Sequence, residues 1–357
     1  MAETPASASV PDAAALRQWL ASHLGSTVGD ELVVQPISGG RSNPTYSIAD
    51  GENSWVLRRP PFGHVLPTAH DMGREYRVLT ALRDTAVPVP RTVGLCKDPS
   101  VIGAEFYVME KLDGTTLRTP RETAQLSRDE RAALSDSMVD LLVELHSIDP
   151  ADVGLADWGR PDGYLERQLG RWRRQWEHSV TSPRPEVDEL YSVLSSTMPA
   201  SHLPGIVHGD FKIDNLMVDR TDPTRIIGLL DWEMSTLGDT LTDVGILCSF
   251  WDHAGEFHNP ITAGATALEG FPRRDELTRR YGARRGIDVH SLEWYLVFAD
   301  FKIAVILEGI HARYLNGDTD AGDDFAGVGA MVGPLLDRAL SRASESGLRS
   351  GSRSVSS

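Results

Sequence analysis

The spacing of apolar and polar residues predicts a small mixed region at the start of the chain. Apolar residues three to four positions apart indicate a first helix: Leu16, Trp19, Leu20 and Leu24. Strand-like runs follow at 32–34, 45–48 and 55–58, and polar or Gly-rich turns separate them. A helix over 72–82 and a strand over 106–109 complete the region. The order β-β-β-α-β favours an α+β architecture over repeated βαβ units.

The rest of the chain is predicted to be mainly helical. An apolar stripe recurs at helical spacing: Leu134, Met138, Leu141, Leu142 and Leu145. One hairpin is expected around 207–231, where short apolar runs flank polar turns. We therefore expect four parts: a tail and helix over 1–29, a sheet-and-helix part over 30–111, a larger helical part over 112–341 and a disordered Ser-rich tail over 342–357.

Composition narrows the class of protein without identifying it. Lys and Arg total 35 against 51 Asp and Glu, a formal net charge of −16. A general nucleic-acid binder is usually basic because it neutralises phosphates, so we expect no nucleic-acid partner. Neither a signal-peptide pattern nor an apolar run of about 18 residues is present, so we expect a cytoplasmic protein with no membrane partner. The two cysteines, Cys96 and Cys248, are too few for a disulfide framework and are expected to be buried.

The candidate chemistry lies in the segment Val207-His-Gly-Asp-Phe-Lys-Ile-Asp-Asn215. Asp210 and Asn215 are five residues apart, and Asp231 follows the apolar run Ile226-Ile-Gly-Leu-Leu230. Phosphoryl transfer needs one carboxylate to accept a proton from the attacking hydroxyl, and oxygen ligands for Mg²⁺. This order and spacing match the catalytic-loop Asp, the catalytic-loop Asn and the metal-binding Asp of kinases.

These residues resemble the aminoglycoside-phosphotransferase superfamily. The segments HGDFKIDN, LLDWEMSTLGD and TDVG carry the resemblance, which spans roughly Leu32 to Leu340. Further stretches, LRRPPFG, AHDMGREYRVLTAL and FKIAVILEGIHARYLNG, are similar to the subgroup related to the kinase-like part of certain acyl-CoA dehydrogenases. The kinase-like part takes up the length of this chain, so we expect no flavin dehydrogenase domain in it. The resemblance implies a protein-kinase-like bilobal fold, with an N-lobe over 30–111 and a C-lobe over 112–341, and an ATP- and Mg²⁺-dependent phosphotransferase that acts on an alcohol group.

The resemblance also implies roles for particular residues. Asp210 matches the catalytic base, and Asn215 and Asp231 match the Mg²⁺ ligands. Arg58 stands where such kinases have a strand Lys, and Glu75 matches its helix partner. The nucleotide-covering loop corresponds to Ser38, Gly39, Gly40, Arg41, Ser42 and Asn43, and the adenine-binding hinge to Met109, Glu110, Lys111 and Leu112.

The chain departs from the family pattern at three places. Arg58 replaces a Lys; its planar fork is not an equivalent group. The Ser38–Asn43 loop lacks the full Gly-x-Gly-x-x-Gly pattern, and Trp232-Glu233 follows Asp231 where protein kinases have Phe-Gly.

Structural interpretations stand beside the functional ones. Arg58 and Glu75 would also fit a surface ion pair, and the Gly39-Gly40 pair would fit a simple hairpin turn. We expect His208 to hold the loop by hydrogen bonds and Asp243 to brace it.

A stripe of arginines bears on the acceptor. On a helix around 164–176, Arg167, Arg171 and Arg174 share one face, while Leu165, Leu169, Trp172 and Trp176 share another. The stripe is either a solvated surface with the aromatic face in the core, or an anion-facing wall whose nearby tryptophans contact an apolar acceptor.

Three functions compete. The first is a kinase for a hydroxylated acyl group, most plausibly a hydroxyacyl-CoA or hydroxy acid. The second is an aminoglycoside or amino-alcohol kinase, and the third is a non-catalytic nucleotide or acyl-CoA binding module. The expected partner is a small-molecule acceptor with a hydroxyl, and the expected state is a monomer or homodimer.

Overall fold

The computed structural model describes residues 11–24, 28–37, 43–61, 71–201, 203–256, 261–288, 292–317 and 327–348. The chain forms two compact units. Unit 1 contains residues up to 114 together with 227–233, and unit 2 contains 115–226 and the residues from 234 onward. The short return of the chain places the segment around Asp231 in unit 1, although it lies far along the sequence from the rest of that unit. The domain boundaries expected from the sequence stay a proposal.

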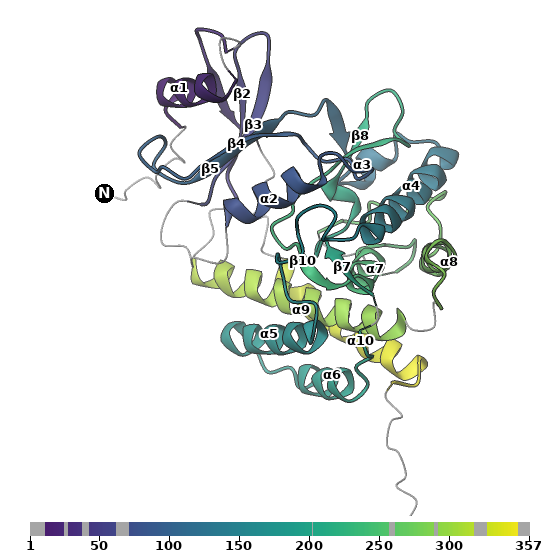
Figure 1. The fold of residues 1–357 in the computed structure, drawn as a ribbon. Coiled ribbons are helices and arrows are strands. Elements are labelled where there is room, and N and C mark those ends of the chain that lie inside the picture. Colours follow the sequence, from purple (N-terminus) through teal and green to yellow (C-terminus); the bar gives the residue numbers. More distant parts are fainter. Residues whose placement is uncertain are drawn as a thin grey trace, which may run out of the picture. The chain divides into compact units, whose positions relative to one another are not determined.

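Unit 1 is built on a five-stranded antiparallel sheet in the order β1-β2-β3-β5-β4 (Figure 1). Its strands are β1 (Val33–Pro36), β2 (Thr45–Ala49), β3 (Ser54–Arg58), β4 (Thr92–Cys96) and β5 (Phe106–Glu110). Its helices are α1 (Ala13–Leu24) and α2 (Met72–Leu82). The predicted strands and α2 are confirmed. Strand β4 was missed, because a five-residue strand directly after a Pro-rich break has little pattern of its own.

The core of unit 1 joins α1 to the sheet. Leu16 and Leu20 of α1 are fully buried in one cluster with Ile48, Leu57 and Phe106 of the strands. The apolar strand residues that α1 covers therefore stabilise it, because a helix of this length is only marginally stable on its own.

Unit 2 is mainly helical. Its helices are α3 (Pro120–Thr123), α4 (Arg128–Ser147), α5 (Tyr164–Ser179), α6 (Pro185–Ser196), α7 (Leu241–Ser249), α8 (Arg274–Arg285), α9 (Glu293–Asn316) and α10 (Val332–Glu345), with short 3₁₀ turns η2 (Ile213–Asn215) and η5 (Val328–Met331). Strand β7 (Pro204–Val207) pairs antiparallel with β10 (Thr236–Asp239). A small sheet has the order β6 (Gly114–Thr116), β8 (Leu216–Asp219) and β9 (Ile226–Leu229), and β6 and β9 contain the points where the chain passes between units.

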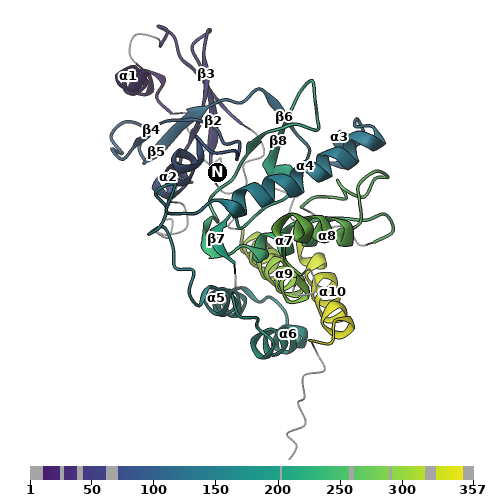
Figure 2. The same cartoon turned by 45° about the vertical axis from the view of Figure 1, so that its right-hand side comes forward.

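The long helix α9 is the centre of unit 2. Helices α5, α7 and α10 all pack against it (Figure 2). Almost every residue from Trp294 to Val305 is buried, and these include the charged residues Asp300 and Lys302. A buried charge needs a partner, so these two positions point to polar sites on either side of the helix.

Two sequence predictions about unit 2 need correction. The hairpin expected over 207–231 is present as β8 and β9, which are neighbours in the small sheet, but Val207 belongs to β7, which pairs with β10 instead. Residues 342–345 were expected to belong to a disordered tail, but α10 continues to Glu345 and buries Ala343 completely. Among the described residues, no helix combines the length and apolarity needed to cross a membrane.

Candidate active site

The catalytic loop follows β7 in unit 2 and turns at Gly209. This glycine has φ 86°, in the left-handed region that favours glycine. A Cβ at this position would lie 2.6 Å from the carbonyl oxygen of Met234. Gly209 is therefore required both for the backbone angle and for the close approach of the neighbouring chain. The turn places Asp210 at the start of the loop.

Asp243 braces this loop, as the sequence predicted. Its fully buried carboxylate accepts hydrogen bonds from the amides of His208 (2.6 Å) and Gly209 (2.7 Å). It lies 3.2 Å from Nε2 of His146, whose Nδ1 lies 2.8 Å from the hydroxyl of Tyr281. Burial opposes ionisation, but the hydrogen bonds and charges around it outweigh burial and lower the pKa of Asp243. An ionised Asp243 can only accept, so the hydrogen on His146 belongs on Nε2.

The side chain of Asp210 is held through one of its two oxygens. Nδ2 of Asn215 donates to the backbone oxygen of Asp210 (2.8 Å) and to Oδ2 (2.9 Å). Nζ of Lys212 donates to the same Oδ2. These contacts orient the carboxylate and leave Oδ1 as the oxygen that can accept a proton. Because Nδ2 of Asn215 is used in this way, its Oδ1 is the atom that suits a metal ion.

Lys302 of α9 contacts the loop at the carbonyl of Gly209. Its Nζ donates to the carbonyl of Gly209 at 2.7 Å and lies 5.5 Å from the ring centre of Trp172. Burial lowers the pKa of Lys302 to about 8, against the opposing attraction of Asp210 and Asp243. The loop thus has a buried cation on its carbonyl side and a buried anion, Asp243, on its amide side.

Unit 1 holds a second cluster around Arg58. Nε of Arg58 lies 3.3 Å from Oε2 of Glu75, and its Nη2 donates to Oδ1 of Asp231 at 3.3 Å. The hydroxyl of Tyr107 donates to Glu75 at 2.8 Å. The side chains of Arg58 and Glu75 are 12% and 2% exposed, so the alternative of a surface ion pair is wrong. Burial opposes the charge of Arg58, but Tyr107, Glu75 and Asp231 together raise the pKa of Arg58.

This cluster has an excess of negative charge. Glu233 adds a third carboxylate, and Nδ2 of the buried Asn43 joins Glu75 (3.0 Å) to Glu233 (3.3 Å). Asp231 has φ 65°, an uncommon angle for a residue with a side chain and one often found at functional sites. Glu75 and Asp231 contact the guanidinium of Arg58, and Glu233 lies near them through Asn43, so carboxylates outnumber the cation here, which suits a divalent cation.

The donors fit Mg²⁺, which prefers oxygen and usually takes one or two protein carboxylates, with phosphates and water completing its shell. Asp231 and the amide oxygen of Asn215 are such donors. In the part of the chain that the structure describes, no group of three or more His, Cys, Asp and Glu forms a metal site of its own.

The predicted nucleotide-binding residues are only partly described. Ser38, Gly39, Gly40, Arg41 and Ser42 lie outside the described residues. Met109 and Glu110 lie in β5, where the amide of Glu110 donates to the carbonyl of Arg91 at 2.8 Å. Lys111 and Leu112 follow the strand, outside its paired residues, so their backbone groups are the ones left for a ligand.

The helix α5 separates the two interpretations of its sequence. Its apolar face is in the core, with Leu165, Leu169, Trp172 and Trp176 all buried. The expectation that Trp172 and Trp176 contact an acceptor is therefore wrong, because their rings are covered by the protein itself.

The three arginines of the stripe differ from one another. All three are exposed, but Arg167 donates to the carbonyls of Asp162 and Arg160 before its own helix. The guanidinium of Arg171 lies 5.2 Å from the ring centre of Trp172. Burial is the main cause of the lowered pKa of Lys302, and the charge of Arg171 lowers that pKa further. Arg171 therefore lies near the catalytic loop, whereas Arg167 holds the start of α5.

Comparison with known families agrees with this geometry. A family model described as the phosphotransferase enzyme family, APH, matches residues 33–286. The chain belongs to the phosphotransferase enzyme family. The predicted family and enzyme class are confirmed.

Two curated relatives are much longer than this chain. Acyl-CoA dehydrogenase family member 11 of Rattus norvegicus is 36% identical over 339 residues, which is 92% of this chain and 43% of the relative. Acyl-CoA dehydrogenase family member 10 of Mus musculus is 34% identical over 313 residues, 86% of this chain and 29% of the relative. The chain thus spans less than half the length of these relatives.

Solved structures confirm the protein-kinase-like α+β fold. A protein from Ralstonia eutropha, provisionally assigned as an aminoglycoside phosphotransferase, is 33% identical with a TM-score of 0.79, and the match covers 94% of this chain and 99% of that one. A thermostable mutant of aminoglycoside phosphotransferase APH(4)-Ia, in a ternary complex with ADP and hygromycin B, is 14% identical with a TM-score of 0.59 over 91% of this chain and 98% of that one. The second likeness concerns the fold alone.

Sequence reasoning missed two lysines of this phosphotransferase. Lys212 stands two residues after Asp210, so its place in the motif was a usable signal. Lys302 is a single charge within the apolar run Phe301-Lys-Ile-Ala-Val-Ile-Leu307. A charge in the middle of a buried helix predicts a polar partner but does not reveal which segment supplies it.

Proposed function

We propose that the chain transfers the γ-phosphate of ATP to the hydroxyl of a small-molecule acceptor, with Asp210 as the base. The observation that carries this proposal is the state of the Asp210 carboxylate. Its Oδ2 is held by Lys212 and Asn215, while Oδ1 has no partner among the described residues. A fixed carboxylate with one open oxygen suits proton transfer from a positioned hydroxyl.

In the proposed step, Asp210 accepts the hydroxyl proton as the acceptor oxygen forms a bond to the γ-phosphorus. The bond between the γ-phosphorus and the β,γ-bridging oxygen breaks, and ADP leaves with the electron pair. The products are a phosphate monoester and ADP. Mg²⁺, bound by Asn215 and Asp231, would neutralise charge on the phosphates.

Arg58 and Lys302 have supporting roles in this proposal. Arg58 keeps Asp231 and Glu75 in place through its two contacts. Lys302 is a positioning residue: it holds the Gly209 carbonyl and thereby the direction in which Asp210 leaves the turn.

The acceptor is proposed to be an acyl compound with a hydroxyl, most plausibly a hydroxyacyl-CoA or a hydroxy acid. The relatives named as acyl-CoA dehydrogenase family members support this class. Arg171 and Arg174 on the exposed side of α5 add positive charge that suits an anionic acceptor. Arg167 is withdrawn from this role because it holds carbonyls beside its own helix.

An aminoglycoside or amino-alcohol is the second candidate acceptor, favoured by the assignment of the Ralstonia eutropha protein. A polycationic acceptor would be repelled by Arg171 and Arg174, which favours the acyl class. A binding module without catalysis is disfavoured by the retention of Asp210, Asn215 and Asp231 together. The cytoplasmic location and the monomeric or dimeric state stay predictions.

A competition assay tests the acceptor class. Purified protein with Mg-ATP is offered hydroxyacyl-CoAs, free hydroxy acids and aminoglycosides, and ADP and phosphorylated product are both measured. Turnover of an acyl compound supports the proposal, and turnover of an aminoglycoside alone overturns the acyl assignment.

Charge reversal then tests the arginines. Arg171→Glu and Arg174→Glu are expected to raise the KM for the acyl acceptor by about tenfold each, the loss of roughly one charge-assisted contact. Arg279→Glu, on the exposed surface of α8, is the control and is expected to leave the KM unchanged. An unchanged KM in both α5 variants would remove the arginines from the acceptor site.

A further inference from the structure

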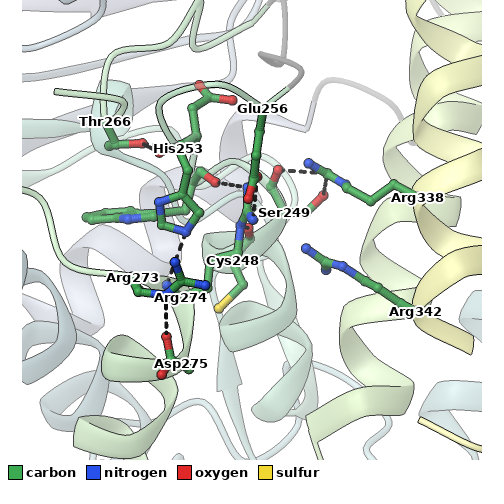
Figure 3. A network of polar contacts seen from close by, with 12 residues as sticks. Cys248, Ser249, His253, Glu256, Thr266, Arg273, Arg274, Asp275, Arg338 and Arg342 are labelled. Atoms are coloured by element: carbon green, nitrogen blue, oxygen red, sulfur yellow. Dashed lines mark hydrogen bonds and ion pairs between the residues drawn. The ribbon is translucent and has the colours of Figure 1, made fainter. Parts of the chain in front are cut away.

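A second polar site in unit 2 lies between α10 and the end of α7. A pocket of about 440 Å³ is lined by Arg274, Arg338 and Arg342 together with Glu256 and Ser341. Figure 3 shows Arg338 and Arg342 reaching from α10 toward Ser249 and Glu256. None of these residues belongs to the catalytic loop.

Two of the arginines share one buried carboxylate. Nη2 and Nε of Arg338 lie 2.6 and 3.0 Å from the two oxygens of Asp300, and Nη1 of Arg342 lies 3.3 Å from Oδ2. Asp300 is fully buried, so both arginines help to keep its charge in the interior. Arg338 makes the closer, two-armed contact and is the main partner of Asp300.

Arg274 is held differently. Its guanidinium donates to the carbonyls of Cys248 and Trp251, and its Nη1 lies 2.7 Å from Oε2 of Glu256. The side chain of Glu256 is 43% exposed. The side chain of Arg274 is only 15% exposed, so Glu256 is the partner of this pair that can turn to water.

The pocket has hydrogen-bonding capacity left over. The Nη1 atoms of Arg338 and Arg342 are buried, and among the described residues neither has a hydrogen-bond partner. Three guanidinium groups share the two paired carboxylates of Asp300 and Glu256, and the buried carboxylate of Asp252 also attracts Arg338. Burial lowers the pKa of Arg274, and the charges of Arg342 and Arg338 lower it further. An anion in the pocket would relieve this repulsion.

Two further carboxylates lie on the rim of the pocket. Asp337 and Glu345 line the pocket but are exposed, where water weakens their attraction for the buried arginines. Glu345 also accepts a hydrogen bond from the hydroxyl of Ser341 at 2.8 Å.

We propose that this arginine pocket binds a small phosphate dianion, either inorganic phosphate or the terminal phosphate of a phosphate monoester. Guanidinium groups bind phosphate through parallel hydrogen bonds, and Nη1 of Arg338 is a donor without a partner among the described residues. Nη1 of Arg342, 3.3 Å from Oδ2 of Asp300, would exchange that longer contact for the anion. Glu256 occupies Arg274 in the absence of the anion and competes with it.

The arginine pocket is a separate site from the catalytic loop. Asp300, which contacts the pocket arginines, and Lys302, which contacts Gly209, are two residues apart on α9. Two residues correspond to a rotation of about 200° around a helix, so the two side chains leave α9 on nearly opposite sides. The inference therefore goes beyond the proposed function and does not depend on it.

Calorimetry with inorganic phosphate on the full chain tests the proposal through variants with opposite expected effects. Arg342→Gln is expected to weaken phosphate binding by about tenfold to a hundredfold, because it removes a charged donor. Glu256→Gln is expected to strengthen binding several-fold, because it frees Arg274. Arg338 is left unchanged because Asp300 depends on it, and Arg279→Gln serves as the surface control.

The two possible sources of phosphate are separated by repeating the titration with a small phosphate monoester such as glycerol phosphate. Tighter binding of the monoester identifies a ligand tail as the occupant, and equal or weaker binding identifies inorganic phosphate. Wild-type binding weaker than about 10 mM for both, or binding that neither Arg342→Gln nor Glu256→Gln changes, would overturn the proposal.

Discussion

The catalytic loop and the arginine pocket both depend on buried charges of α9, but they differ in how completely their polar groups are paired. At the loop, the Gly209 carbonyl meets Lys302, while the amides of His208 and Gly209 meet Asp243. In the pocket, Asp300 is paired, but two guanidinium nitrogens beside it make no hydrogen bond within the described residues.

The loop and the pocket are therefore suited to different roles. At the loop, the amides of His208 and Gly209 and the carbonyl of Gly209 are all paired with buried charges, which holds the turn in one geometry, and a base must be held in one geometry to act. An incompletely paired network carries an energetic cost that a ligand can remove. The loop is therefore suited to positioning a reaction, and the pocket to taking up an anion.

The largest expected effect comes from the one open oxygen of the loop. Asp210→Asn preserves shape and most contacts but removes the basic carboxylate, so kcat should fall by about 10²–10⁴-fold. Nucleotide affinity and thermal stability should stay near wild type. Steady-state kinetics and calorimetry with Mg-ADP measure both quantities, and a variant that keeps wild-type turnover would remove Asp210 from the role of base.

Removing the carboxylate of Asp243 should destabilise the loop, because it removes the acceptor of two backbone amides. Asp243→Ala leaves two amides and His146 without their acceptor, so the free energy of unfolding should fall by about 3–5 kcal/mol. Urea denaturation measures this, with the exposed Asp275→Ala as control. A loss below about 1 kcal/mol would mean that water replaces Asp243 without cost and that the loop is not held by this network.

Lys302 gives a smaller, pH-dependent effect. Its pKa is lowered to about 8 in the folded protein, so the unfolded chain binds more protons between pH 8 and about 10.5. The free energy of unfolding of the wild type should therefore rise with pH across this window, relative to Lys302→Met, by up to about 3 kcal/mol. Denaturation of both proteins at several pH values gives the difference curve. A difference that is flat, or that falls as pH rises, would show that the ammonium is not strained by burial.

The loop and the elements of unit 1 could be predicted from the sequence to a greater extent than the arginine pocket, for a physical reason. Asp210 and Asn215 stand five residues apart in one motif, so both could be named as candidates from the sequence. The bracing role of Asp243 could be predicted because the residue stands near that motif's metal-binding Asp, although it lies 35 residues from His208. The strands of unit 1 and the helix α2 were likewise visible as local patterns. Strand β4 was not, because its place is set by pairing with β5 rather than by its own residues.

The arginine pocket and Lys302 could not be predicted because their partners are distant in sequence. Arg274 lies on α8 and Arg338 on α10, and only the packing of the helices places both beside one pocket. Lys302 is matched to Gly209 by the way that α9 passes the loop. A charged residue in an apolar helix signals a buried polar site. Only the fold determines whether its partner is a guanidinium group, as for Asp300, or a carbonyl, as for Lys302.

Phosphorus NMR of the wild-type protein with Mg-ATP and a hydroxyacyl-CoA tests the central claim most directly. A new phosphate monoester signal is expected that grows in equal amount with ADP and that is absent with Asp210→Asn. ADP and inorganic phosphate without a monoester, across the whole acceptor panel, would contradict the claim that Asp210 directs the γ-phosphate to an acceptor hydroxyl.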